Sequence, residues 1–159
     1  MQPDFFRKIT GNFASGVTVV STIGRRDQPY GVTVNSFTSV SLDPILVLVC
    51  LHNRLGGLTT FLESQLFAIN ILSRTQVHIS NYFSSPRMDR SRHLSWRAAS
   101  GVPLIRGCLG HLECHLENTH TAGDHTILVG RVVEGRLRPR AGEPLLFFRG
   151  KYRQIGPAA

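Results

Sequence analysis

A run of seven apolar residues, "ILVLVCL" at positions 45–51, constrains the possible folds of this chain more than any other feature. Successive side chains of a β-strand point to opposite faces of its sheet, so a strand that is apolar at every position is buried on both faces. Seven residues suit a strand, whereas a buried helix needs at least about ten. We therefore expect a central strand here, with the rest of the chain packed around it.

Strand patterns also dominate the rest of the sequence. They cover "VTVVST", "YGVTVNS", "LFAINIL", "LGHLECHLENTHT", "HTILVGRVVEG" and "PLLFFRGKYR". The turn residues of "GRRDQPY" join the first two of these segments into a predicted hairpin. Helices are expected over residues 3–16, 53–64 and 73–83. Together these patterns predict a mainly β fold in one domain over residues 1–159, a closed or nearly closed antiparallel barrel of six or seven strands with two or three peripheral helices.

Two segments are expected to be loops. Residues 84–103 are rich in Ser, Arg and Pro and contain one tryptophan, which predicts a long loop or flap. Loops of this length in a compact domain are usually functional or disordered. The stretch "TVNSFTSVSLDP" (33–44) begins in a strand and is expected to continue as an extended loop.

The chain carries a formal net charge of +8, with sixteen arginines and two lysines. Such a surplus attracts phosphate, either on nucleic acid or on nucleotide cofactors. Much of it lies in "RMDRSRHLSWR" (87–97) and "EGRLRPR" (134–140), which the alternative interpretation treats as solvated loops. No basic strand carries the interleaved aromatic residues on which single-stranded nucleic acid stacks, so we expect no nucleic-acid partner.

No apolar stretch is long enough to span a bilayer, so we expect no membrane partner. Asp4, Arg7 and Lys8 stand where a signal peptide would have its apolar core, which argues against export. An odd number of cysteines without CxxC spacing is typical of reduced thiols, and we expect a cytoplasmic protein. The cysteines are interpreted as inert packing residues in apolar strands: Cys50, Cys108 and Cys114.

Neither GxGxxG nor the P-loop motif occurs, which excludes the two commonest phosphate cradles. A different cradle is possible at Thr33–Ser41, where small hydroxyl and amide side chains alternate with apolar ones and the backbone can present successive N–H groups to a ring edge or a phosphate. A second candidate is "CLHNRLGG" (50–57), which leads to a helix N-terminus that favours an anion, with Asn53 and Arg54 at its entry. The alternatives are an ordinary Ser- and Thr-rich strand and a surface arginine.

One predicted strand carries a possible metal-binding pattern. In "GHLECHLE" the residues that share one strand face are His111, Glu113, His115 and Glu117. Imidazole and carboxylate groups are good metal ligands. We favour a polar outer face with cross-strand pairs over a metal site, and we predict no bound metal.

The segment "AGDHTILVG" (122–130) places His125 on the first residue of a strand, directly after a Gly-Asp turn. A histidine in this place either takes part in chemistry or only caps the strand. The residues around it help to decide between these roles, because they form part of a longer pattern.

Six segments occur in the order and spacing of one family: "FASGVTVVST", "YGVTVNSFTSVSLDP", "LVLVCL", "FAINIL", "AGDHTILVGRVV" and "PLLFFRGKYR". Over residues 5–152 the chain resembles the short-chain flavin reductases, the reductase components of two-component flavin-dependent monooxygenases. The resemblance implies an FMN-binding split barrel that forms homodimers. It also implies that FMN or FAD is bound and is reduced with NADH or NADPH, and that a partner monooxygenase receives the reduced flavin.

The resemblance assigns flavin contacts in three groups. The residues expected to hold the isoalloxazine edge are Thr33, Val34, Asn35 and Ser36. Those expected beside the ribityl chain and phosphate are Ser39, Val40 and Ser41. Those expected to line the same pocket are Cys50, Leu51, His52 and Asn53.

The remaining roles follow from the same resemblance. Relatives often have small hydroxyl residues after the asparagine, and this chain has "RLGG" instead, which leaves Arg54, Thr59 and backbone N–H groups for the phosphate. His125 would lie where the nicotinamide stacks on the flavin, as the catalytic residue that hydrogen-bonds the carboxamide or the flavin edge and excludes water. Phe83 and Tyr152 are candidate lids, and the arginines of "RMDRSR" could hold the pyrophosphate tail of FAD.

We therefore predict an NAD(P)H:flavin oxidoreductase that supplies reduced flavin to a monooxygenase. The alternative keeps the fold without the catalysis, as a flavin-binding or electron-transfer split barrel with tightly bound FMN and no activity toward NAD(P)H.

Overall fold

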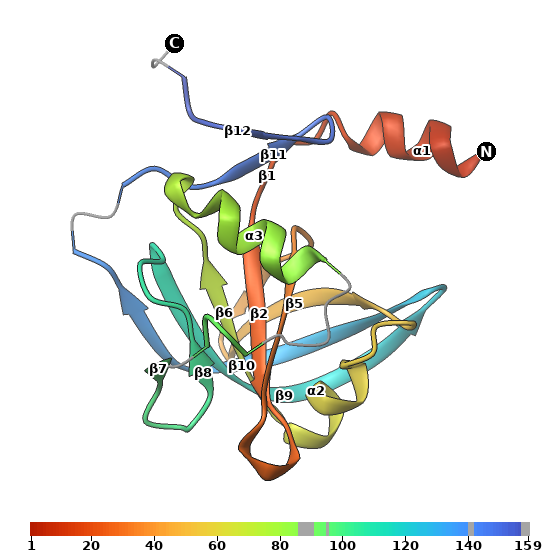
Figure 1. The fold of residues 1–159 in the computed structure, drawn as a ribbon. Helices are drawn as coiled ribbons and strands as arrows, with labels where there is room; N and C mark the ends of the chain where they lie inside the picture. Colours follow the sequence, from red (N-terminus) through yellow and green to blue (C-terminus); the bar gives the residue numbers. More distant parts are fainter. Residues whose placement is uncertain (86–90, 95, 140–141, 157–159) are drawn as a thin grey trace.

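The computed structural model describes residues 1–85, 91–94, 96–139 and 142–156. Its main feature is a seven-stranded antiparallel sheet in the order β3-β2-β6-β9-β10-β5-β4 (Figure 1). The strands are β2 (Thr18–Ile23), β3 (Pro29–Val34), β4 (Thr38–Leu42), β5 (Ile45–His52), β6 (Leu66–Ile71), β9 (Gly110–Ala122) and β10 (His125–Leu137). The predicted mainly β architecture and the predicted hairpin of β2 with β3 are confirmed.

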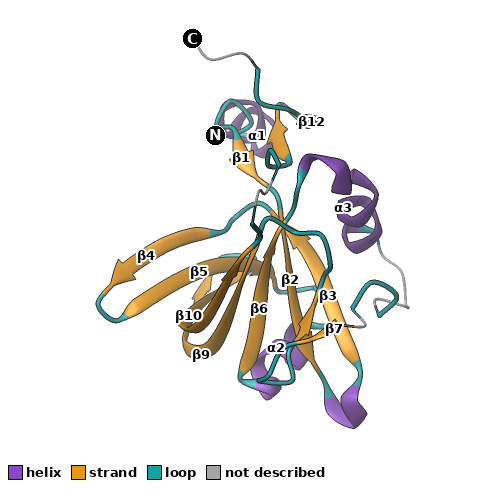
Figure 2. Ribbon diagram, turned by 90° about the vertical axis from the view of Figure 1, so that its left-hand side faces the viewer, coloured by secondary structure: helices purple, strands orange, loops and turns teal. Residues whose placement is uncertain are grey.

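The sheet bends into an open barrel, and the hairpin of β4 and β5 extends away from the rest (Figure 2). Ser36, just after β3, closes one end of the barrel. The backbone N–H of Cys50 on β5 donates to Ser36 Oγ over 2.9 Å, and Ser36 Oγ–H donates to the Cys50 carbonyl over 3.2 Å. The end of β3 is therefore joined to β5, although the two strands lie near opposite edges of the sheet.

The apolar run at 45–51 forms β5, as expected, but not the central strand of the sheet. It lies next to the edge, between β10 and the edge strand β4. One of its faces is buried through Val47, Val49 and Leu51, whereas the other face is only half-buried. The expectation of burial on both faces is therefore wrong for the isolated chain, and part of this apolar surface remains open.

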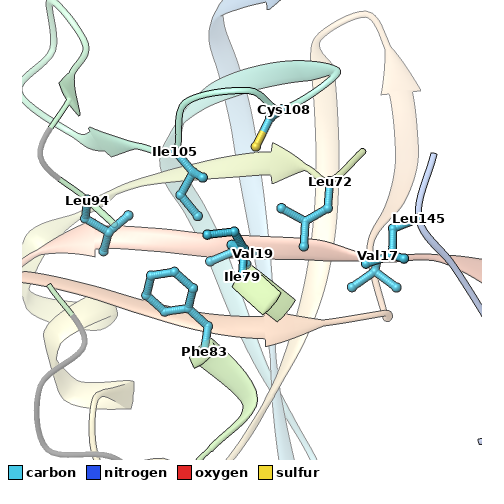
Figure 3. Close-up of a cluster of buried hydrophobic side chains, with 9 residues drawn as sticks. All are labelled: Val17, Val19, Leu72, Ile79, Phe83, Leu94, Ile105, Cys108 and Leu145. Carbon is cyan, nitrogen blue, oxygen red and sulfur yellow. The ribbon is translucent and has the colours of Figure 1, made fainter. Parts of the chain in front are cut away.

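Two large apolar clusters make up most of the core of the described residues. One fills the barrel, and its buried residues are Val20, Val47, Val49, Leu51, Phe61, Phe67, Ile69, Cys114 and Leu128. The other packs α3 (Val77–Ser84) and neighbouring loops onto β2, through the residues that Figure 3 shows: Val17, Val19, Leu72, Ile79, Phe83, Leu94, Ile105, Cys108 and Leu145.

Burial raises the pKa of the Cys108 and Cys114 thiols to about 12, so both behave as packing residues. Cys108 lies in a loop before β9 and not in a strand, contrary to expectation.

The three α-helices of the described residues lie at the periphery. α1 (Pro3–Thr10) ends at Gly11, earlier than predicted, because Ser15–Gly16 forms strand β1. β1 pairs with β11 (Leu146–Phe148), and β11 pairs with β12 (Lys151–Arg153). α2 (Leu58–Ser64) buries Phe61. The predicted serine cap precedes α3, where the Ser73 N–H donates to Gln76 Oε1 over 3.0 Å. Among the residues that the structure describes, no helix has the length and apolar character of a membrane span.

Much of the predicted flap is ordered structure. Strands β7 (Trp96–Arg97) and β8 (Pro103–Leu104) form a hairpin. Ala98, Val102 and Leu104 of this hairpin are buried against Ala68 of β6, so these residues form a cover on the barrel. Two arginines of "RMDRSR", Arg87 and Arg90, lie outside the described residues.

The polar face predicted on β9 divides into two halves. His111 and Glu113 are buried, because the β7–β8 segment covers this end of the strand. His111 Nε2–H donates to the Ile105 carbonyl over 2.8 Å, and Ser100 Oγ–H donates to Glu113 over 2.6 Å, so the prediction of an outer face is wrong here. Further along, Glu117 forms the expected cross-strand pair with Arg131 over 2.6 Å. Across the described ranges no three His, Cys, Asp or Glu side chains converge as a metal site requires.

Gly130 allows the barrel core to pack tightly. A Cβ at this position of β10 would overlap the ring of Phe67 and lie 3.0 Å from the Cβ of Cys114. Because both neighbours are buried, Gly130→Ala is expected to lower the free energy of unfolding by about 1–3 kcal/mol, measured by urea denaturation. Gly135 lies on the same strand, and a Cβ there would meet its nearest neighbour at an ordinary 3.5 Å. Gly135→Ala should stay within about 0.5 kcal/mol, and equal losses would contradict this account.

Candidate functional site

A cavity of about 240 Å³ opens where β3 and β5 end and β10 begins. It brings together many of the residues predicted from the sequence: Thr33, Val34, Asn35, Ser36, Cys50, Leu51, His52 and His125. Val32 and Leu55 complete the wall and were not predicted. Neither has a sequence signal of its own, because an apolar residue in a strand or turn is interpreted as core.

Strand register explains why these residues meet. β5 and β10 are antiparallel partners, and His52 lies directly opposite His125. The two hydrogen bonds between Ser36 and Cys50 hold the end of β3 against β5. The cavity is thus built on paired backbone segments, which fixes the relative positions of its side chains.

His125 is oriented by its sequence neighbour. Its Nδ1 lies 2.7 Å from Asp124 Oδ1, and its side chain is 41% exposed. The hydrogen bond from His125 is the main cause that holds the pKa of Asp124 below its usual range. A carboxylate accepts, so Nδ1 carries the proton of neutral His125 and Nε2 remains available to a ligand.

His52 belongs to the same cluster. Its Nδ1 accepts the Arg54 backbone N–H over 2.9 Å, and its Nε2 lies 3.8 Å from Asp124 Oδ2. The His52 and His125 rings meet edge to face, with their centroids 5.0 Å apart. One carboxylate therefore faces two imidazoles at the rim of the cavity.

Asn53 holds the turn that presents His125. Its backbone N–H donates to the Asp124 carbonyl over 2.9 Å, and its Nδ2 donates to the Gly123 carbonyl over 3.1 Å. Its Oδ1 accepts the Thr126 hydroxyl over 2.8 Å. Gly123 has a φ of 61°, which favours glycine in this tight turn. The structure thus places Asn53 behind the cavity and not in its wall.

A second cavity, of about 260 Å³, adjoins the first and shares Thr33, Val34 and Asn35 with it. Tyr152 lies here, and its hydroxyl is 2.8 Å from Ser80 Oγ and 2.9 Å from Asn81 Oδ1. The other lining residues were not predicted: Val17, Ser80, Ser84 and Phe147. Ser80 and Ser84 lie four residues apart on α3, a spacing that places both on one helix face and could have indicated a polar stripe.

Several predicted residues do not line either cavity. Ser39, Val40 and Ser41 lie on β4, so the predicted loop of free N–H groups is instead an edge strand paired with β5. An edge strand still has unpaired backbone groups on its outer side. Arg54 and Thr59 are exposed near the start of α2, which begins at Leu58, later than predicted.

The prediction of Phe83 as a lid is wrong. Its side chain is 0% exposed and belongs to the core cluster under α3. Its ring serves packing instead, and of the two candidate lids Tyr152 is the one that lines a cavity.

Comparison with known proteins identifies this arrangement. The family model described as flavin reductase like domain matches residues 10–156. The chain belongs to the flavin reductase-like family. The family and the split-barrel fold that the sequence predicted are thereby confirmed.

Relatives in the family are similar to this chain over nearly its whole length. An NADH-dependent flavin reductase from a Rhodococcus species is 42% identical over 156 residues, which cover 96% of this chain and 86% of that protein. The nitrilotriacetate monooxygenase component B homologue of Mycobacterium thermoresistibile has a TM-score of 0.92 and 35% identity, with 97% and 87% of the two chains covered. An NADH:FAD oxidoreductase from Streptomyces globisporus, solved with NAD and FAD fragments, has a TM-score of 0.89 and 36% identity, with 97% and 93% covered.

Proposed function

We propose that this protein is an NADH-dependent flavin reductase that passes reduced flavin to a partner monooxygenase. The names of its relatives support each part of the activity, since they include an NADH-dependent flavin reductase, an NADH:FAD oxidoreductase and a monooxygenase component. The observation that carries the proposal is the pair of adjoining cavities that share Thr33–Asn35, with His125 at the rim of one.

The cavities fit a flavin. Together they reach the size of ordinary cofactor sites, roughly 300–1,000 Å³. The Asn35 side chain lines both, is exposed, and makes no hydrogen bond to the described residues, so its amide can pair with the donors and acceptors of the flavin pyrimidine edge. Thr33, Val34 and Ser36 would flank that edge. When bound, the flavin supplies the redox chemistry by accepting a hydride from the nicotinamide.

His125 would serve as the residue that positions the nicotinamide. Asp124 fixes its ring, and the free Nε2 can accept a hydrogen bond from the carboxamide amide. The imidazole also excludes water from the rim, while proton transfer by this residue is not required for hydride transfer. Leu51 and His52, whose ring contacts that of His125, would line the wall beside it.

The flavin phosphate would lie on the exposed side of the site, toward Arg54 and Thr59 and the outer edge of β4 with Ser39, Val40 and Ser41. These groups offer a guanidinium, hydroxyls and unpaired backbone N–H groups. The chain can use this surface for FMN or for the first phosphate of FAD. The free cysteines fit a reducing compartment, and we place the enzyme in the cytoplasm.

We also propose that the protein is a homodimer. α1 has no buried residue, and Phe5, Phe6 and Phe13 are 60%, 55% and 81% exposed. On the β4–β5 hairpin, Val40, Leu42 and Ile45 are exposed as well. Large exposed apolar surfaces beside an edge strand mark an interface. A second copy would cover the half-buried face of β5, which explains why the whole run at 45–51 is apolar.

NADH oxidation by the purified protein tests the main proposal. We expect a rate that depends on added FAD or FMN, followed as loss of reduced nicotinamide absorbance, with NADPH as the comparison. A titration of flavin fluorescence with FMN and FAD gives the preferred flavin. Absence of a flavin-dependent rate with either nucleotide would overturn the proposal, and a yellow protein that ignores NADH would support the electron-transfer alternative.

His125→Ala is expected to lower kcat/KM for NADH about tenfold, the value of one lost hydrogen bond, while flavin affinity changes much less. The matched control is His120→Ala, since His120 is an exposed histidine of the same hairpin, outside both cavities. Equal losses of NADH turnover and flavin affinity in His125→Ala would assign the residue a purely structural role.

Leu42→Lys tests the dimer, since Leu42 is 89% exposed on the edge strand. We expect at least about tenfold weaker self-association, measured by light scattering after size-exclusion chromatography. Leu137 is 83% exposed at the far end of β10, and Leu137→Lys should leave the dimer intact. A monomeric unmodified protein would refute the proposal.

A further inference from the structure

A third cavity, of about 350 Å³, lies at the opposite end of β10 from His125. Its lining residues are Trp96, Arg106, Gly107, Cys108, His111, Arg136, Leu137 and Arg138. None of them lines the candidate flavin site. His125 and Arg136 are eleven positions apart on one strand, which corresponds to about 36 Å at the usual rise of a strand.

Positive charge is concentrated at this cavity. It has three arginines in its wall, Arg106, Arg136 and Arg138. Arg138 donates to the Gly107 carbonyl over 3.0 Å, and Arg106 forms no ion pair with the described residues. Among those residues, the carboxylate that approaches the cluster is Glu113, 3.6 Å from Arg136. Within the described ranges, Arg106 and Arg138 therefore have no ion-pair partner.

Aromatic groups form the other side of the cavity. The Arg136 guanidinium lies over the Trp96 ring, 5.7 Å from its centroid. The His111 ring meets the indole edge to face at 5.2 Å, and burial lowers the pKa of His111, so it adds no charge near neutral pH. Trp96 is half-buried and leaves part of its surface open to the cavity.

Arg136 is held from below by a buried charge. The Glu113 side chain is 4% exposed, and its Oε1 has no hydrogen-bond partner among the described residues. The carboxylate attracts Arg136 without a close hydrogen bond, so the guanidinium is oriented between Glu113 and Trp96 while its donors remain available to a ligand. Arg136 is therefore oriented by two neighbours although its side chain is 40% exposed, and solvent or a ligand can reach it.

We propose that this cavity, the Trp96 site, binds a small organic anion that carries a planar ring. The ring would pack against Trp96 and Arg136, and the anionic group would accept hydrogen bonds from Arg106 and Arg138, whose planar forks match carboxylate and phosphate. A nucleoside monophosphate and an aromatic carboxylate both have this chemistry. The proposal is independent of flavin reduction, because the two sites share no residue.

Trp96 provides a direct signal, because it is the one tryptophan of the chain. AMP and benzoate are titrated separately into the full-length protein without flavin or NADH, and tryptophan fluorescence is followed. We expect a saturable change with at least one of them, and at least about tenfold weaker binding of its uncharged counterpart, adenosine or benzamide. Tighter binding of AMP identifies a nucleotide site, and tighter binding of benzoate identifies an aromatic-acid site.

Substitution of the arginines tests whether their side chains bind the anion. Arg106→Ala with Arg138→Ala should weaken the binding at least about tenfold and leave flavin-dependent NADH oxidation unchanged. Arg153→Ala on β12, far from the cavity along the chain, is the control and should bind as the unmodified protein does. If the double variant unfolds, as circular dichroism would show, Arg106→Ala alone serves, because Arg106 makes no ion pair here. No saturable change with either anion, or equal weakening in Arg153→Ala, would overturn the proposal.

Discussion

The antiparallel pairing of β5 with β10 is the contact on which the site depends. It places His52 opposite His125, and the Ser36 hydroxyl then joins the end of β3 to Cys50 of β5. Residues from strands that are far apart in the sheet order thereby meet around one cavity. Backbone hydrogen bonds set these positions more rigidly than side-chain contacts could, and rigid placement is what hydride transfer between two stacked rings requires from a protein.

The polar groups of the site mostly orient one another. Asp124 faces both His52 and His125, while Asn53 binds the turn that carries Asp124. The polar groups that remain for a ligand include the His125 Nε2 and the Asn35 amide. Such a site supplies shape and a small number of directed hydrogen bonds, and it leaves the redox chemistry to the cofactors.

The two ends of β10 differ in their charged groups. At its start, one carboxylate is shared between two histidines, and at its end three arginines line a cavity with Trp96 and Arg136 approaches the buried Glu113. The formal charge of +8 is therefore not spread evenly over the molecule. Its concentration beside Trp96 arises because the β7–β8 hairpin folds back over β9, a contact that the charge of these segments does not specify.

The sequence by itself determined most strands of the large sheet, the hairpin of β2 with β3, the family and most of the residues around the first cavity, because each follows from local periodicity, turn chemistry or a motif of adjacent residues. Only the tertiary structure decided which side chains are covered. Phe83 became core and not a lid, His111 and Glu113 were buried by a hairpin, and β5 came to lie beside the edge of the sheet. Tyr152 reached Ser80 across 72 positions of the chain. Burial and such contacts depend on segments distant in the chain, and the pattern of a single segment carries no information about what will pack against it.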